Sequence, residues 1–168
     1  MRPDRALAVA AFLLAATALL LPWWQVTLDD GTFVDRYTFR AFQPVEPWTT
    51  AWAPWLTGLL AAAAIALLFL RLAANSHEHE PASWRRDLSL ATGLLAAAVA
   101  SCLLWPNIVP SFWGGRTYTV ATGPPTTETA MPGLGWWLAL VATLLAALAS
   151  WKSRQNPAGQ GAHDATTK

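Results

Sequence analysis

The sequence has few charged residues, and four long stretches of it have none. Charged residues make up 12% of the 168 residues, against 54% hydrophobic residues. Residues 6–24, 51–70, 88–105 and 133–151 contain no Asp, Glu, Lys, Arg or His. A soluble helix carries charges on one face, so these stretches exclude an ordinary soluble bundle. About 20 residues at 1.5 Å per residue cross a hydrocarbon core of about 30 Å, and each stretch is therefore expected to be a transmembrane helix.

Cysteine, histidine and an excess of charge of one sign are also scarce. The single cysteine, Cys102, cannot form an internal disulfide and has no histidine near it in the sequence to activate it as a nucleophile. No histidine lies in an apolar stretch, which excludes an axial haem ligand there. His77, Glu78, His79 and Glu80 could hold a metal ion in principle, but the spacing is more typical of a polar loop. The net charge of +1 offers no basic stripe for nucleic acid. We expect no cofactor, no metal site, no catalytic residue and no nucleic-acid partner.

The basic residues predict the orientation in the membrane. Eight of the eleven lie on one side: Arg2, Arg5, Arg71, Arg85, Arg86, Lys152, Arg154 and Lys168. The other side has Arg36, Arg40 and Arg116. Basic residues near helix ends stay in the cytoplasm, so both termini and the loop 71–87 are expected inside, in a multi-pass protein of the cell membrane. Loops 25–50 and 106–132 are then outside.

Both outer loops carry the signals of β-hairpins. In the first, residues 26–28 and 32–39 are rich in β-branched and aromatic residues and flank the turn Asp29-Asp30-Gly31. In the second, residues 111–113 and 116–120 flank Gly114-Gly115. A lone hairpin is marginal in water, so the two are expected to join in one small sheet. The proline-containing stretches that follow, with Pro44 and Pro47 and with Pro124, Pro125 and Pro132, are predicted to be irregular connections.

The fold predicted is an all-α membrane protein, a bundle of four transmembrane helices made of two similar helix-hairpin-helix halves with small extracytoplasmic hairpins. Residues 1–151 form one domain, and the polar tail 152–168 is expected to be disordered. Helix crossings in lipid favour small residues. The pairs expected to face inward are Gly58 with Ala62, Gly93 with Ala97, and Ala96 with Ala100.

The stretch Leu21-Pro22-Trp23-Trp24-Gln25-Val26-Thr27 resembles uncharacterised prokaryotic four-helix membrane proteins whose first helix ends in a Pro-Trp-Trp element. It is also similar to the first-helix exit of claudins, which combine four helices with an outer β-sheet. The claudin Gly-Leu-Trp element and paired outer cysteines are absent, so the resemblance does not imply a tight-junction function.

The eleven tryptophans are distributed unequally, with only Trp84 and Trp151 near the inner boundary. The outer ones either form a floor for the hairpins or belong to a surface that binds a lipid or a protein. Trp23, Trp24, Trp136 and Trp137 are assigned to an interfacial belt. The candidate outer-face contact residues are Phe33, Arg36, Tyr37, Trp48, Trp113 and Tyr118.

The function predicted is that of a non-enzymatic structural or accessory membrane protein acting through this outer face. Its partners would be membrane lipid and either another membrane protein or further copies of itself. The alternative is a small facilitator or transporter for an apolar or lipid-like solute. The spans offer only hydroxyl and thiol groups as polar side chains, which disfavours an ion pathway.

Overall fold

The structure is a computed structural model that describes residues 3–43, 52–74, 81–104, 116–119 and 125–155. The described helices are α1 (Pro3–Leu20), α2 (Ala53–Ala73), α3 (Pro81–Ser101) and α4 (Leu134–Gln155), with a 3-10 turn, η1, over Cys102–Leu104. The described strands are β1 (Trp24–Asp29), β2 (Val34–Phe39), β3 (Arg116–Thr119) and β4 (Pro125–Pro132). In the described residues, each half of the chain has the order helix, strand, strand, helix; the first half follows the prediction, whereas in the second half only the strand at 116–119 was predicted.

The end of α1 differs from the prediction. The predicted helix 6–24 ends at Leu20, because a residue that precedes proline avoids the helical region and Leu21 precedes Pro22. Trp24 consequently starts a strand instead of closing a helix. At the other end of the chain, α4 continues through Lys152 to Gln155, so the predicted disordered tail begins too early. The rest of that tail lies outside the described residues.

Three of the four helices, α1, α2 and α4, are long and apolar enough to cross a membrane. The third predicted span is not confirmed as such. Helix α3 has 21 residues, and every stretch of membrane-spanning length within it includes Arg85, Arg86 and Asp87 near its start. The prediction for 88–105 left these charges in the preceding loop, whereas the helix begins earlier and incorporates them.

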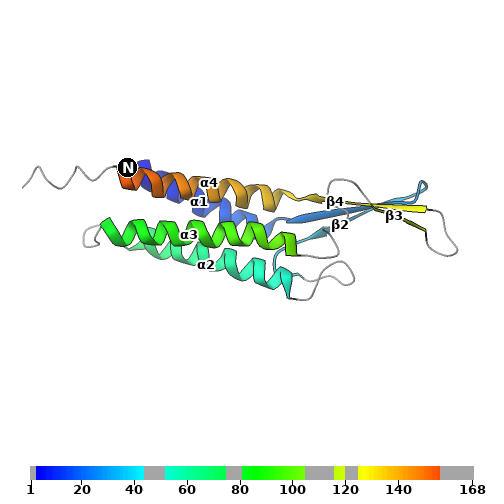
Figure 1. Cartoon of the computed structure of the whole chain (residues 1–168), viewed down its shortest axis with the longest axis horizontal. Helices are drawn as coiled ribbons and strands as arrows, with labels where there is room; N and C mark the ends of the chain where they lie inside the picture. The colour runs from blue at the N-terminus through cyan, green and yellow to red at the C-terminus, as the bar shows by residue number, and fades with distance from the viewer. Residues whose placement is uncertain (1–2, 44–51, 75–80, 105–115, 120–124, 156–168) are drawn as a thin grey trace, which may run out of the picture.

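The four helices form an up-down bundle in which each helix packs on two neighbours, α1 on α4 and α2, and α3 on α2 and α4 (Figure 1). Its interior consists mainly of alanine. Helix α1 buries Ala8, Ala11, Ala15 and Ala18, and α4 buries Ala139, Ala142, Ala146 and Ala149. This alternation of three and four residues is the spacing of left-handed helix pairs, and small side chains let the backbones approach closely.

The predicted small-residue pairs are correct only in part. Gly58 is buried, but Gly93, Ala96, Ala97 and Ala100 are exposed. Nothing lies within 4 Å of the position a Cβ would take on Gly93. The inward face of α3 is instead formed by Leu88, Ala91, Leu95 and Ala98. Alanine is so frequent on every side of these helices that spacing alone does not identify the buried face.

The four strands form one antiparallel sheet in the order β2-β1-β4-β3. Figure 1 shows this sheet continuing along the long axis beyond the end of the bundle. The first predicted hairpin and the predicted strand 116–119 therefore belong to one sheet, which extends away from the helices.

Strand β4 was not predicted. Residues 125–132 were expected to be an irregular connection, yet they pair with β1 on one side and with β3 on the other. Their prolines occupy only the two ends of the strand, where proline is tolerated, and the interior is rich in threonine. The predicted partner of 116–119, residues 111–113 with the turn Gly114-Gly115, lies outside the described residues.

The order of the strands in the sheet shows that the two halves of the chain are not related by a two-fold axis in the sheet. A two-fold axis relating them would exchange β1 with β3 and β2 with β4. However, β1 is a central strand and β3 is an edge strand. The central pair instead joins the strand that leaves the first helix to the strand that enters the last one.

Candidate functional site

The root of the sheet is an aromatic core at the end of the bundle. Trp23, Trp24 and Phe39 are all almost fully buried, together with Val26 and Ala130. The indole Nε1 of Trp23 donates a hydrogen bond to the carbonyl oxygen of Ala18 at 2.9 Å, in the last turn of α1. The assignment of Trp23 and Trp24 to an interfacial belt is therefore wrong. They are core residues because the chain turns from helix to strand at Pro22 and folds them under the sheet.

Backbone hydrogen bonds fasten this root to the first and last helices. Trp23 N donates to Phe39 O at 2.7 Å, Gly133 N donates to Trp23 O at 2.8 Å, and Gly135 N donates to Pro22 O at 2.8 Å. A Cβ on Gly133 would overlap the carbonyl oxygen of Pro22, and one on Gly135 would crowd three carbonyl oxygens. Glycine is required at this crossing because two backbones touch there.

Trp136 and Trp137 lie beside the root at the start of α4. Trp136 donates from Nε1 to the carbonyl oxygen of Val99 at 3.3 Å, and its ring meets that of Trp137 edge to face at 4.8 Å. Trp137 is 47% exposed, and Trp52 and Trp55 are also exposed at the same end of the bundle. Trp137 thus has the position that a belt residue needs, whereas Trp136 serves the packing of α4 on α3.

The register separates the two faces of the sheet, because directly opposed residues point to the same side. One face carries Trp24 and Val26 of β1, Phe39 of β2 and Ala130 of β4, and it is buried near the root. The other face carries Gln25, Thr27, Arg36, Thr38, Thr127 and Thr129. These residues are partly or fully exposed, and the same face also carries the exposed apolar residues Val34 and Met131, so it is mainly but not wholly polar.

The tip of the first hairpin is held by two carboxylates. Asp29 Oδ1 accepts a hydrogen bond from Gly31 N at 2.8 Å, and Asp30 Oδ1 accepts from Thr32 N at 2.8 Å and from Phe33 N at 2.7 Å. The bonds from the Phe33 and Thr32 amides lower the pKa of Asp30 from its ordinary value. Gly31 has a φ of 81°, which the Asp-Gly turn requires. The predicted hairpin is confirmed, with its turn where the sequence indicates.

Strand β2 is an open edge of the sheet. Among the described strands it pairs with β1 alone, and every residue of β2 except Phe39 is exposed. Asp30 N donates to Phe33 O, so 30 and 33 form a bonded pair, and antiparallel pairing alternates from there. Asp35, Tyr37 and Phe39 therefore direct their backbone groups to β1. Val34, Arg36 and Thr38 direct theirs outward, at a free edge of the described sheet.

The structure describes four of the six predicted contact residues. Phe33 is 74% exposed at the hairpin tip, and Tyr37 is 40% exposed on the same face of the sheet as Val26. Arg36 lies on the opposite face, and Tyr118 pairs with Thr126 in the register of β3 and β4. The four described residues therefore do not all lie on one face of the sheet. Trp48 and Trp113 lie outside the described residues.

The sequence did not predict two polar contacts between helices. Thr57 Oγ1 lies 2.6 Å from Ser101 Oγ between α2 and α3, and Ser89 Oγ lies 3.0 Å from Ser150 Oγ between α3 and α4. Thr57 and Ser101 also bond the preceding turn of their own helix, as Thr17, Thr92 and Thr143 do. The spacing of these hydroxyls along the chain does not show which of them contact a neighbouring helix.

Within the described residues, no cluster of three or more His, Cys, Asp or Glu side chains is placed to hold a metal ion. His77, His79 and their neighbouring glutamates lie outside those residues. Comparison with known proteins found no matching family model and no matching curated protein.

Proposed function

We propose that the chain is a non-enzymatic membrane protein that crosses the cell membrane four times, with both termini in the cytoplasm, and holds its sheet outside. The apolar spans α1, α2 and α4 support membrane insertion. Its role is that of an accessory protein that binds a partner protein through the free edge of β2.

The fourth span in this proposal is α3 together with η1. Its charged residues all lie before Leu88, and residues 88–104 extend about 25 Å, close to the roughly 30 Å of a hydrocarbon core. Asp87 is buried against Arg71 of α2, with Arg86 also in contact, so its charge is compensated at the membrane boundary. Only the first turns of α3 then lie outside the apolar layer.

The observation that carries the proposal is the edge strand β2. It leaves three backbone amides and their carbonyls unpaired at the free edge of the described sheet, and such an edge can accept a strand from another chain. Phe33 and Val34 at one end add exposed apolar surface, and Asp35 with Arg36 offers charges of both signs. Pairing of two copies centred on Arg36 would oppose like charges, which favours a different chain as the partner.

The alternative function, a facilitator for an apolar solute, has less support. The residues around the bundle axis fill it: Ala11, Ala64, Leu95 and Ala142 have almost no exposed surface. A facilitator needs a path between the helices, and this interior would have to open for a solute to pass.

Substitution of one edge residue tests the proposal. Proline at Arg36 removes an outward amide and leaves the bonds to β1 intact, because proline is tolerated at such a position of an edge strand. The matched control, Arg36→Ala, removes the same side chain and keeps the amide. We expect Arg36→Pro to reduce copurification of the partner from native membranes at least about tenfold, and Arg36→Ala to reduce it far less.

A cysteine at Phe33 in the same proteins reports the side of the membrane, since an impermeant thiol reagent reaches it in intact cells only if the sheet is outside. Equal recovery of the partner with proline and with alanine at position 36 would reject strand pairing. Self-pairing would show as cross-linking between differently tagged copies, lost in the proline variant alone.

A further inference from the structure

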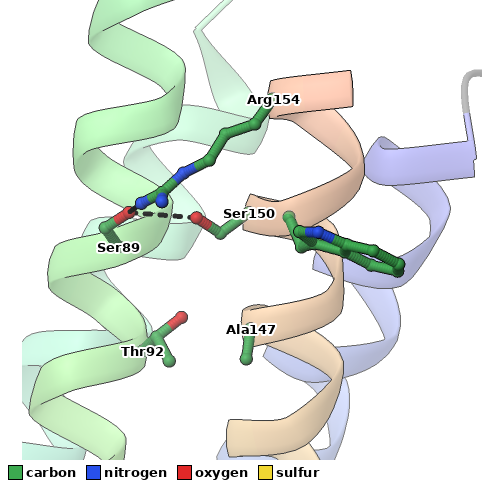
Figure 2. A pocket seen from close by; sticks show the side chains of 6 residues that line it. Ser89, Thr92, Ala147, Ser150 and Arg154 are labelled. Carbon is green, nitrogen blue, oxygen red and sulfur yellow. Dashed lines mark hydrogen bonds between the residues drawn. The ribbon is translucent and has the colours of Figure 1, made fainter. Parts of the chain in front are cut away.

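The end of the bundle farthest from the sheet has an open groove between α3 and α4. It measures about 300 Å³ and is lined by Ser89, Thr92, Ala147, Ser150, Trp151 and Arg154. Figure 2 shows the two serines meeting across the groove, with the Arg154 side chain reaching over them from the last turn of α4. The groove thus combines hydroxyl groups, a guanidinium group and an indole ring in one place.

Hydrogen-bond donors exceed acceptors in this groove. The Ser89 and Ser150 hydroxyls lie 3.0 Å apart, and Arg154 Nη2 donates to Ser89 Oγ at 3.3 Å. A guanidinium has five N–H donors, so most of those on Arg154 remain available to a ligand. A bound oxyanion would accept from the guanidinium in the bidentate geometry that arginine offers to phosphate.

The charge of Arg154 is not balanced by the described residues. At the same end of the bundle, Arg71 and Arg86 both contact the carboxylate of Asp87. No carboxylate of the described residues lies within ion-pair distance of Arg154. An anion in the groove would supply the missing charge.

The walls of the groove extend toward apolar surface. Ala147 and Thr92 lie deeper along the helices than Arg154, and Leu144 and Leu148 are exposed on α4. Trp151 is 55% exposed at the rim, and indole rings favour the membrane interface. A ligand with an anionic head and an acyl chain matches both parts of this surface, whereas a small soluble anion would leave the apolar part uncovered.

We propose that this groove is a specific site for an anionic phospholipid of the inner leaflet. Its phosphate binds Arg154 and the hydroxyls of Ser89 and Ser150, and one acyl chain lies over Thr92 and Ala147. Basic grooves between transmembrane helices on the cytoplasmic side bind anionic headgroups in this way. The proposal relies on membrane insertion with this end inside, but it is independent of any partner at the sheet.

The test uses the full chain purified in detergent and three probes, namely phosphatidylglycerol, phosphatidylcholine with the same acyl chains, and inorganic phosphate. Arg154→Gln removes the charge in the groove. Lys152→Gln is the matched control, because Lys152 is exposed in the same helical turn and does not line the groove. Retained lipid is counted by native mass spectrometry during titration.

We expect Arg154→Gln to weaken binding of phosphatidylglycerol about tenfold or more, and Lys152→Gln to change it less than about twofold. Phosphatidylcholine should bind wild type more weakly, since its own cation already neutralises the phosphate. Ser89→Ala should weaken binding less than Arg154→Gln, because it removes a neutral donor only.

Three results would overturn the proposal. Equal weakening by Arg154→Gln and Lys152→Gln would indicate general attraction to a basic surface. Equal affinity for the two lipids would remove the role of the anionic headgroup. Displacement of phosphatidylglycerol by inorganic phosphate at matching concentration would make the site one for a soluble anion. Thermal stability of each variant without lipid checks that the bundle remains folded.

Discussion

The bundle and the sheet have opposite distributions of side-chain size. In the bundle the small residues are inside, as with Ala11 and Ala142, and the large apolar residues such as Leu13, Phe69 and Leu144 are outside. At the root of the sheet the large residues Trp23 and Trp24 are inside, and along β2 the outside is formed by charged, hydroxyl and exposed aromatic residues. Lipid gives no hydrophobic drive between helices, whereas water does drive aromatic burial. The difference is the one expected if the bundle lies in lipid and the sheet in water, as we propose.

The largest expected effect on stability comes from replacing a buried tryptophan at the root of the sheet, compared with an exposed tryptophan on the surface of the bundle. Trp23→Ala should lower the free energy of unfolding by about 4 kcal/mol, because it leaves a cavity and removes the bond to Ala18 O. Trp137→Ala should cost less than about 1 kcal/mol in detergent, since the ring is half exposed. Thermal and denaturant unfolding in one detergent would measure both. Similar losses for the two variants would show that the root is not a core.

The next test concerns the joint between the two regions. Gly133→Ala should cost about 3 kcal/mol, because the new methyl group overlaps the Pro22 carbonyl and two backbones must separate. Gly93→Ala is the control in α3, where nothing lies near the added carbon, and it should be neutral or raise stability by about 0.5 to 1 kcal/mol. Unfolding midpoints compare the two. If Gly93→Ala were destabilising, the result would support the prediction from sequence that Gly93 faces the interior of the bundle.

The smallest effect on stability is expected at the exposed tip of the first hairpin. Because folding lowers the pKa of Asp30, its stabilising contribution is present at neutral pH and is lost as the pH falls through the lowered value. Amide exchange at Thr32 and Phe33 should therefore accelerate relative to the root in acid, beyond the intrinsic pH dependence. Asp30→Asn should abolish this extra acceleration, because the side chain no longer titrates. Its persistence in that variant would assign the effect to another group.

The sequence predicts the first hairpin well because its turn, Asp29-Asp30-Gly31, and its β-branched strands are adjacent along the chain. It misses β4, whose principal partner β1 lies about a hundred positions earlier in the register of Val26 with Ala130. When only neighbouring residues are considered, the prolines at both ends of β4 favour an irregular connection more strongly than its threonines favour a strand. Pairing over such separations leaves no local signal.

The sequence predicts where the helices lie, but it does not predict which residues face inward or which residues form the groove. Runs without charge locate the helices, but an alanine-rich surface has no apolar face distinct from the rest, so the inward residues of α3 could not be identified. The groove on α3 and α4 joins Ser89 to Ser150, which are 61 positions apart. Only the packing of the two helices brings those hydroxyls and Arg154 together.

The pairing of β1 with β4 also bears on the order in which the protein is made. The first hairpin is synthesised early, but in the proposed topology residues 25, 27 and 29 of β1 do not pair with β4 until β4 has been synthesised and translocated. The bonds of Gly133 and Gly135 to Trp23 and Pro22 form later still, as α4 enters the membrane. A chain that stopped before α4 would expose both edges of its hairpin. In the proposed topology, assembly of the sheet is therefore a late event that follows insertion of the last helix, and a formed sheet indicates that the whole chain has been inserted.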